Sequence, residues 1–287
     1  MGIVFVTLLG LAAGQLAGAP ESVPRFADRL DPAALDAVIA QLRAAAAQSP
    51  LDAEPRLQLA RAESFWADLH AEAAAPTQEL IGHLSAGVEA AREALKLVSP
   101  GYAAAVRESR PLPEALQAIE PSGAAALYWI AADQHQLAAQ RGLAALLLES
   151  DDLRRLFARV IQLAPETFHG GAYLHEAELA LAVPAGYAAS LETATGELIQ
   201  AARFGAGWLC VDLVWAERWA VKAQDYGLFK RKLDRVLETR SDVDPDLIPE
   251  NELAKRKAKA LLAASQVLFT RAAIQRGETP AAGKHPR

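Results

Sequence analysis

The residues best suited to bind a ligand lie between Trp208 and Asp225, a segment with three of the five tryptophans and the only cysteine. At 3.6 residues per turn, one helical stripe carries Trp208, Val211, Asp212, Trp215, Trp219 and Lys222. Trp215, Trp219 and Lys222 could line a groove or pore, where indole faces contact an apolar ligand and the ammonium binds a carboxylate. Core packing, with the Lys222 ammonium reaching solvent, is the alternative.

Two glycines next to a helix start form a second candidate ligand site. Gly170 and Gly171 precede a helix expected from residue 172, and His169 and Tyr173 flank them. Backbone N–H groups at a helix N-terminus bind phosphate or carboxylate, so an anion site is one interpretation. Close packing between helices is the other. Trp129 lies on a strongly apolar segment and is expected either in the core or on a concave ligand-binding face.

The histidines do not indicate a metal site, because His169 and His175 are six residues apart and do not share a helical face. His175-Glu176 also lacks the second histidine of a zinc-protease helix. The chain contains neither a G-x-S-x-G elbow nor a phosphate-binding loop. We therefore predict no metal, no cofactor and no enzymatic activity. A helical enzyme would need a cleft that gathers several of Asp133, His135, His169, His175 and Glu176.

Composition excludes several classes of protein. β-Branched residues are sparse and 22% of residues are charged, which indicates an all-α protein. The formal net charge is -6 and no basic stripe is present, so nucleic acid is not an expected partner. Lys255, Arg256 and Lys259 form a local basic cluster, which is either a solvated helix face or a docking surface for an acidic partner.

Hydrophobic periodicity and helix-capping residues predict a long series of helices. They are expected at residues 34–47, 54–70, 77–98, 123–148 (with a kink near Gly142), from a Ser150/Asp151 cap to residue 164, and at 172–182, 187–203, 208–225, 226–238 and 251–276. Asp225 is expected to cap the helix at 226–238. Residues 101–122 contain several prolines and are expected to form short helical pieces.

Three of the predicted helix ends look alike: AAAAQSP at 44–50, ALKLVSP at 94–100 and VIQLAP at 160–165. A proline that ends one helix and precedes the next helix pair is typical of tetratricopeptide-like repeats. The spacing of these ends exceeds the period of about 34 residues of regular repeats. We therefore predict an irregular tetratricopeptide-like α-solenoid of antiparallel helix pairs, with a concave surface for ligands or partners.

The N-terminus indicates export. The first nineteen residues carry no charge, Ile3–Ala13 is apolar, and Ala17-Gly18-Ala19 matches the small-x-small pattern of a cleavage site. Residues 1–19 are therefore expected to be a signal peptide or an uncleaved N-terminal anchor, with a buried N-terminal helix as the alternative. The helical repeat domain is expected over residues 20–276, followed by a disordered tail at 277–287.

Four stretches carry a resemblance to a known family: ALYWIAAD at 126–133, ETFHGGAYLHEAELA at 166–180, RWAVKAQDYGLFKRKLDRVL at 218–237 and ENELAKRKAKALL at 250–262. Across residues 123–262 the chain resembles the T-component (TatT) family of tripartite ATP-independent periplasmic (TRAP) transporters. The resemblance implies an exported, tetratricopeptide-type protein that pairs with the periplasmic solute-binding protein and is able to form a homo-oligomer. Family members often carry a lipid anchor, but this sequence has no lipobox cysteine near its N-terminus.

These observations favour a periplasmic accessory component of a TRAP-type uptake system, which docks onto a solute-binding protein and contacts a small apolar or carboxylate ligand. The expected ligand-binding residues are Trp129, His169, Gly170, Gly171, Tyr173, Trp215, Trp219 and Lys222, and the expected docking residues are Lys255, Arg256 and Lys259. Contact with the membrane is expected only through residues 1–19. The alternative function is a general protein–protein scaffold with no small-molecule ligand.

Overall fold

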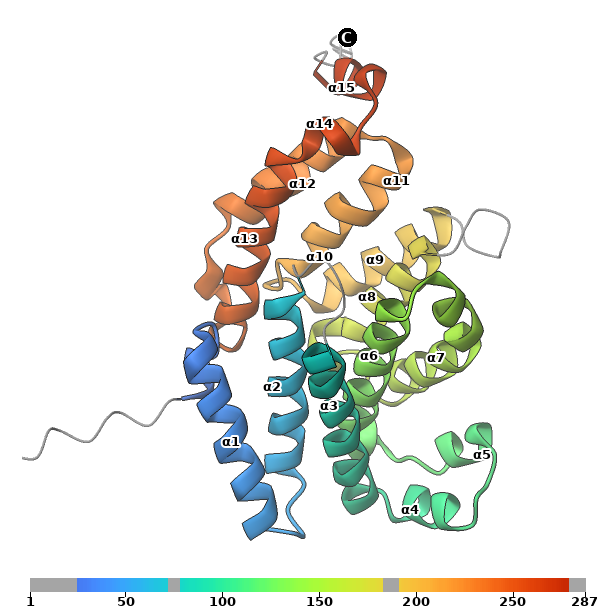
Figure 1. Ribbon diagram of the computed structural model, residues 1–287. Coiled ribbons are helices and arrows are strands. Elements are labelled where there is room, and N and C mark those ends of the chain that lie inside the picture. Colours follow the sequence, from blue (N-terminus) through green and yellow to red (C-terminus); the bar gives the residue numbers. More distant parts are fainter. Residues whose placement is uncertain (1–24, 72–77, 183–190, 279–287) are drawn as a thin grey trace, which may run out of the picture.

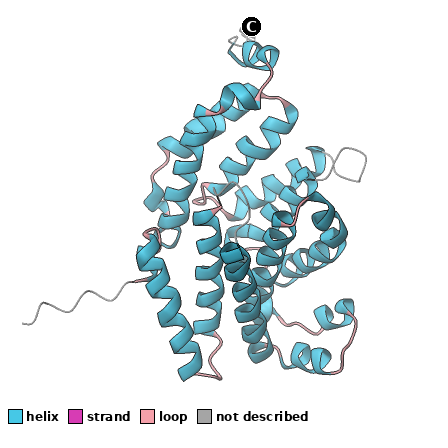
Figure 2. Ribbon diagram, in the orientation of Figure 1, coloured by secondary structure: helices cyan, strands magenta, loops and turns pink. Residues whose placement is uncertain are grey.

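The computed structural model describes residues 25–71, 78–182 and 191–278, and the regular elements in these ranges are all helical, with no strand among them (Figure 2). The expected all-α class is therefore confirmed. No helix within the same ranges has the length and apolar character needed to cross a bilayer. The expected signal or anchor segment at 1–19 and most of the expected tail lie outside the described residues.

The first three long helices lie side by side (Figure 1): α1 (Pro32–Gln48), α2 (Glu54–His70) and α3 (Gln78–Val98). A short 3-10 turn, η1 (Phe26–Asp28), precedes them. Asp31 caps α1 by accepting a hydrogen bond from the Ala34 backbone N–H at 2.9 Å, and Pro32 occupies the first helical position. The predicted bounds of α2 agree with the structure, in which Pro55 lies in the first turn of the helix.

The proline-rich connection forms short elements, as predicted: α4 (Pro100–Arg107), α5 (Leu112–Gln117) and the 3-10 turn η2 (Pro121–Gly123). Then follow α6 (Ala124–Gln140) and α7 (Leu143–Leu163). The prediction of one kinked helix at 123–148 is wrong, because Gly142 adopts φ +97° and separates two helices. The predicted helix start at Ser150/Asp151 is also wrong, since both residues lie inside α7.

α8 (Thr167–Ala182) packs against α6 and α7, and α9 (Leu191–Phe204) packs against α8. Three successive residues near the start of α8 have positive φ angles: Phe168 (42°), His169 (56°) and Gly170 (75°). Non-glycine residues rarely adopt this left-handed conformation, so the surrounding packing must hold Phe168 and His169 in it. Periodicity gave no sign of this turn.

The predicted helix at 208–225 is divided into α10 (Cys210–Val214), a π-helical turn η3 (Trp215–Ala220) and α11 (Val221–Ala223). A π-helical turn has hydrogen bonds between residues five apart, so it is wider than the turn assumed for the predicted stripe. Gln224 then adopts a left-handed conformation, and α12 (Tyr226–Glu238) begins. Asp225 caps α12 by accepting from the Leu228 backbone N–H at 2.8 Å, which confirms that prediction.

The last predicted helix, 251–276, is three helices: α13 (Ile248–Ala263), α14 (Ser265–Leu268) and α15 (Arg271–Glu278). Two 3-10 turns, η4 (Ser241–Val243) and η5 (Pro245–Leu247), precede α13. Gln224 holds the break before α15, because its side-chain amide donates to the Leu268 carbonyl at 3.1 Å and accepts from the Thr270 N–H at 2.9 Å. This contact joins residues far apart in sequence, so periodicity could not reveal the break.

A buried ion pair joins the segment before α1 to the start of α13. The Arg29 side chain, 1% exposed, binds the Glu250 carboxylate and donates to the Asp246 carbonyl at 2.9 Å. Arg61 on α2 binds the same Glu250 carboxylate at 2.9 Å. Because η1, α2 and α13 share this contact, α13 lies close to the N-terminal helices, as Figure 1 shows.

Candidate functional site

The predicted tryptophan–lysine stripe is largely occupied by contacts within the protein. The half-buried rings of Trp215 and Trp219 lie 5.5 Å apart, and the Trp219 indole N–H donates to the Leu191 carbonyl and to the Thr195 hydroxyl oxygen. The exposed Lys222 side chain donates to the Leu181 carbonyl at 2.5 Å. Asp212 of the same predicted stripe also has a partner within the protein, since it binds Lys232 of α12 at 2.7 Å.

The glycine pair at the start of α8 lies where helices approach closely. A β-carbon on Gly170 would come within 2.8 Å of the Phe204 β-carbon, and one on Gly171 would lie 2.7 Å from Tyr128 ring carbons. The predicted flanking residues face protein groups: Tyr173 stacks on Phe204, and His169 lies 3.7 Å from the Asp244 carboxylate. These contacts give the packing interpretation of the glycines a direct physical cause.

Trp129 belongs to a buried aromatic group on α6, α8 and the segment before α10. Its ring lies 4.9 Å from Tyr128 and 4.7 Å from Phe168, and the Phe168 ring also contacts Trp208 at 5.3 Å. The left-handed turn at 168–170 places Phe168 between these rings. The structure thus brings Trp129, His169 and the glycine pair into one neighbourhood, on different elements from the Trp215–Trp219 pair.

The predicted basic cluster lies on α13, where Arg256 and Lys259 are exposed and Lys255 is half-buried. Lys257, between them in sequence, points into the protein instead. Burial opposes its charge, yet the Asp68 carboxylate and other acidic neighbours raise the pKa of Lys257 above its usual value. Lys257 therefore stays protonated at neutral pH and contributes a buried positive charge.

Lys257 belongs to a group of six titratable side chains that we call the interior polar cluster, drawn from α2, α6, α8, η3 and α13. Its members are Asp68, His135, His175, Glu178, Arg218 and Lys257. Burial raises the pKa of Asp68, and Lys257 opposes that rise. Buried charges cost free energy unless they are paired. Five of these side chains are buried or half-buried, and Arg218 reaches them from the surface with 49% of its side chain exposed. Such a group of titratable side chains has the electrostatic character of a functional site.

Glu178 is the centre of this cluster. Burial opposes its ionisation, but the hydrogen bond from His175 and the charge of Arg218 lower the pKa of Glu178 to about 2. The two carboxylate oxygens have different neighbours: Oε1 lies 3.7 Å from Arg218 Nε, and Oε2 lies 3.0 Å from His175 Nδ1. Glu178 is therefore ionised throughout the physiological pH range.

Two histidines from different helices meet at this carboxylate. His135 Nδ1 lies 3.2 Å from His175 Nδ1 and 3.9 Å from Glu178 Oε2. Burial, followed by the neighbouring His175, lowers the pKa of His135 to about 4, so its imidazole is neutral. His175 Nε2 faces the other way and lies 3.4 Å from the buried Tyr128 hydroxyl oxygen. Among the described residues, His135, His175 and Glu178 are the group whose ligand atoms converge as a metal site requires.

The residues required for a helical enzyme are only partly gathered. His135 and His175 meet, whereas Asp133 lies against Gly87 of α3. Burial raises the pKa of Asp133, and the neighbouring carboxylates of Asp68 and Glu63 raise it further. Glu176 is on the side of α8 that faces Arg154 and Glu197, where burial raises its pKa to about 7. His169 is paired with Asp244, away from both.

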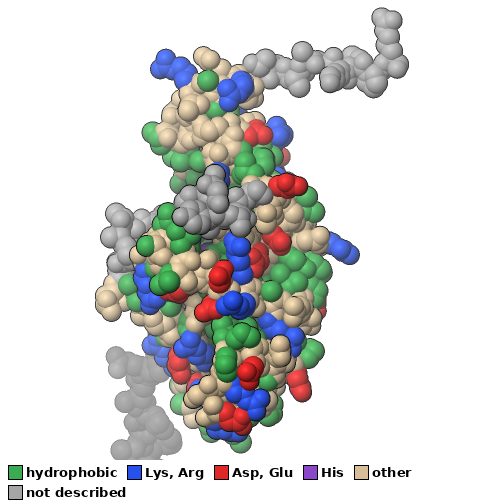
Figure 3. All heavy atoms as spheres, turned by 90° about the vertical axis from the view of Figure 1, so that its right-hand side faces the viewer, with side chains coloured by type: hydrophobic (Ala, Val, Ile, Leu, Met, Phe, Trp, Pro, Cys, Tyr) green, Lys and Arg blue, Asp and Glu red, His purple; other side chains and the backbone are tan. Residues whose placement is uncertain are grey.

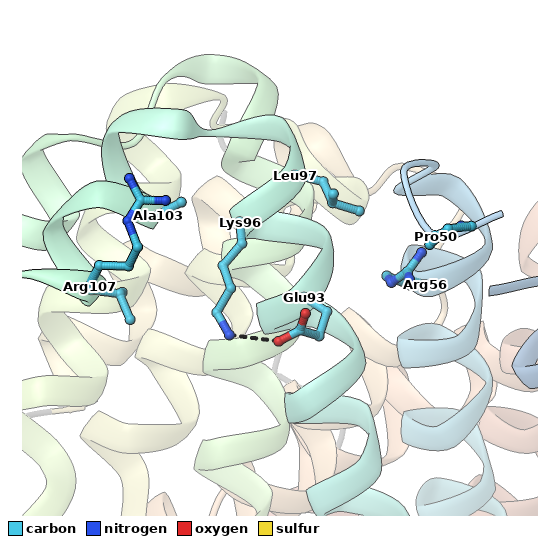
Figure 4. A pocket seen from close by; sticks show the side chains of 8 residues that line it. Pro50, Arg56, Glu93, Lys96, Leu97, Ala103 and Arg107 are labelled. Carbon is cyan, nitrogen blue, oxygen red and sulfur yellow. Dashed lines mark hydrogen bonds and ion pairs between the residues drawn. The ribbon is translucent and has the colours of Figure 1, made fainter. Parts of the chain in front are cut away.

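Pockets also open on the surface of the described residues, away from this cluster. One, of about 360 Å³, lies between the α1–α2 turn and α3–α4, where Lys96 binds Glu93 at 2.6 Å and Arg56 donates to backbone carbonyls (Figure 4). The other, of about 230 Å³, lies between α3, α4, α5, α6 and α7, and its lining combines leucine and isoleucine side chains with Arg92, Tyr102, Glu149 and Asp152. On the face in Figure 3, positive and negative side chains are interspersed, so no single-sign field directs a ligand there.

Sequence reasoning missed four members of the interior polar cluster: Asp68, Glu178, Arg218 and Lys257. Each lies on a helix that also carries ordinary surface charges, so no pattern within its own helix sets it apart. The one available signal is the position of Arg218 between Trp215 and Trp219, in a segment that is apolar over most of its circumference. The side of the helix on which Arg218 lies depends on the π-helical turn, which the sequence pattern did not predict.

Comparison with known proteins shows the family to which the chain belongs. No curated protein matches the chain significantly. The family model described as TRAP transporter T-component matches residues 84–269, well over half of the chain, and covers α6 to α13 with the cluster residues on them. That family comprises transporter components and is not a family of enzymes. The chain therefore belongs to the TRAP transporter T-component family.

Proposed function

We propose that this protein is an exported accessory component of a TRAP-type solute uptake system, which docks onto the periplasmic solute-binding protein. The observation that carries the proposal is the family match over residues 84–269. The uncharged residues 1–19 support a periplasmic location, either free or held by that segment. Self-association through a further surface is compatible with this role.

The proposed docking surface is the basic side of α13, formed by the exposed Arg256 and Lys259 together with the half-buried Lys255. Positive side chains at the edge of an interface accelerate association with an acidic partner and contribute to specificity. We expect the triple variant K255E/R256E/K259E to bind the solute-binding protein encoded with this chain at least about tenfold more weakly, mainly through slower association. Surface plasmon resonance at two salt concentrations measures this.

A matched control places three charge reversals elsewhere, at the exposed residues Lys230, Arg231 and Arg276 of α12 and α15. This control has the same net charge as the test variant, but its charge reversals lie outside α13. It should therefore bind like the unchanged protein. If the unchanged protein does not bind the solute-binding protein at all, the docking proposal fails. If both triple variants lose affinity equally, net charge and not α13 decides binding.

The second half of the proposal is that the protein contacts a small apolar or carboxylate ligand. Trp215 supports this, because its ring is half-buried and leaves part of the indole open to an apolar ligand, beside the Lys232 ammonium that pairs with Asp212. The remaining candidates for ligand contact are Trp129, His169, Gly170, Gly171, Tyr173, Trp219 and Lys222. Tryptophan fluorescence during titration with short-chain carboxylates tests the idea, and W215F should remove most of the signal.

A general protein–protein scaffold is the second candidate function. The packing of Trp219 and Lys222 against backbone carbonyls of α8 and α9 favours it, since these groups already have partners inside the protein. We also propose that the helices form an irregular tetratricopeptide-like solenoid, because α1, α3 and α7 each end just before a proline and another helix. Binding of the solute-binding protein without any ligand-dependent fluorescence change would support the scaffold function.

A further inference from the structure

We propose that His135, His175 and Glu178 form a binding site for a first-row divalent transition metal ion, with Zn²⁺ as the best-fitting ion. Two imidazole nitrogens and one carboxylate oxygen would bind the ion, and a water molecule would complete the coordination. The site does not depend on the proposed docking function, because metal binding is measured on the protein alone.

The distances between the three donor atoms carry the proposal. In a tetrahedral zinc site, ligand atoms about 2.0–2.1 Å from the metal lie about 3.3 Å from one another. Here His175 Nδ1 lies 3.0 Å from Glu178 Oε2 and 3.2 Å from His135 Nδ1. The third edge, between His135 Nδ1 and Glu178 Oε2, is 3.9 Å. A side-chain adjustment of about 0.6 Å on one edge therefore suffices.

Without an ion, His175 Nδ1–H donates to Glu178 Oε2 at 3.0 Å, so a metal ion bound here would take the place of that proton. A metal-binding histidine usually donates its other ring N–H to an oxygen. His175 Nε2 could then donate toward the Tyr128 hydroxyl oxygen, 3.4 Å away, and the Nδ1 lone pair would face Glu178 Oε2 and His135 Nδ1. At these distances the three lone pairs repel one another unless a proton or a metal ion lies among them. The occupant is either a metal ion or a proton, and the experiment below separates the two.

The fold holds the ligands in place before any ion binds. His175 and Glu178 are three residues apart on α8, which puts both side chains on one face, and α6 with His135 packs against that helix. The Phe157 ring stacks on His175 at 5.1 Å and meets His135 edge-on at 6.2 Å, so neither imidazole is free to turn. Arg218 contacts Glu178 Oε1 and leaves Oε2 for the ion.

The site is enclosed yet accessible to water. The side chains of His135 and His175 are 8% and 11% exposed, and that of Glu178 is 17% exposed. A nearly dry surrounding strengthens the attraction between a carboxylate and a divalent ion. The remaining exposure at Glu178 leaves room for the water that a site with three protein ligands requires.

The test is titration of the metal-free full-length protein with Co²⁺ and Zn²⁺ alone. We expect one Co²⁺ per chain, with the strong visible absorption of tetrahedral Co²⁺, displaced by one equivalent of Zn²⁺ in calorimetry. The conservative variants H135Q and E178Q should each weaken Co²⁺ binding by at least about tenfold, and Y128F should weaken it about 10-fold through the lost contact to His175.

A matched control removes a histidine outside the site. H70Q changes the imidazole that stacks on Trp66 of α2 and should leave Co²⁺ affinity and stoichiometry unchanged. Circular dichroism of each metal-free variant checks its fold. If H135Q or E178Q does not fold, the weaker Co²⁺ binding expected for Y128F tests the proposal in its place. Absence of saturable Co²⁺ binding by the unchanged protein overturns the proposal, and so does Co²⁺ binding by H135Q and E178Q as tight as that of the unchanged protein. Either result leaves a proton as the occupant.

Discussion

Gly171 lies directly against the Tyr128 ring: a β-carbon at residue 171 would come within 2.7 Å of the Tyr128 ring carbon Cζ. The close approach leaves the fully buried Tyr128 hydroxyl facing His175 Nε2 at 3.4 Å. The glycine that sequence analysis linked to anion binding thus supports the orientation of a buried histidine. Helix packing, not a ligand, is the contact that requires glycine here.

We expect Gly171→Ala to destabilise the protein by about 1–3 kcal/mol, because the added methyl group forces Tyr128 out of its position. Equilibrium unfolding in urea measures the change. Gly196→Ala on α9 is the matched control, since no atom lies within 4 Å of its β-carbon position. That control should be neutral or stabilise by up to about 1 kcal/mol. Equal effects of the two substitutions would contradict the packing explanation.

Removal of the Glu250 carboxylate should be costly. Burial lowers the pKa of Arg29 to about 10, and Glu250 opposes that shift, so Glu250→Ala leaves a buried guanidinium without its counter-charge. We expect a loss of about 3–5 kcal/mol in the free energy of unfolding. Glu93→Ala removes an exposed carboxylate that pairs with Lys96 and should cost no more than about 1 kcal/mol. A loss below 1 kcal/mol for Glu250→Ala would show that the pair contributes little.

Cys210 should react slowly with thiol reagents in the folded protein. Burial, followed by the negative charge of Glu178, raises the pKa of the Cys210 thiol well above its usual value. Each unit of upward shift reduces the thiolate fraction about tenfold at a given pH below the pKa. We expect iodoacetamide labelling at pH 8 to be at least about tenfold slower in the native protein than in denaturant. Because the chain has one cysteine, mass spectrometry reads the rate directly.

Between pH 7 and 9 the labelling rate of the native protein should stay low, since the raised pKa keeps the thiol protonated across that window. The unfolded chain, with an ordinary thiol, should gain reactivity steadily over the same range. A native rate that rises in parallel with the unfolded one would show that Cys210 has a normal pKa.

Asp225→Ala should remove the cap of α12 and cost about 1 kcal/mol in urea unfolding, because the Leu228 N–H loses its acceptor. Asp225→Asn keeps an oxygen acceptor at the same position and should retain most of the stability. If the asparagine variant loses as much as the alanine variant, the charge of Asp225 and not its hydrogen bond stabilises the helix.

The features that the sequence determined by itself are local. Capping residues and prolines near Asp31, Pro100 and Asp225 determined where α1, α4 and α12 begin, because those signals act within one helical turn. Motifs in the second half of the chain likewise indicated the family that the match over 84–269 confirms. Both kinds of information lie in short stretches of adjacent residues.

The remaining features were decided by tertiary contacts. The left-handed turn at Phe168 and His169 is held by rings from other elements, and the break before α15 is held by Gln224. His135 and His175 are 40 residues apart, and they meet only because α6 packs against α8. Helical periodicity shows which residues share a face, but packing between helices decides which faces meet, so the interior polar cluster emerged only in the folded chain.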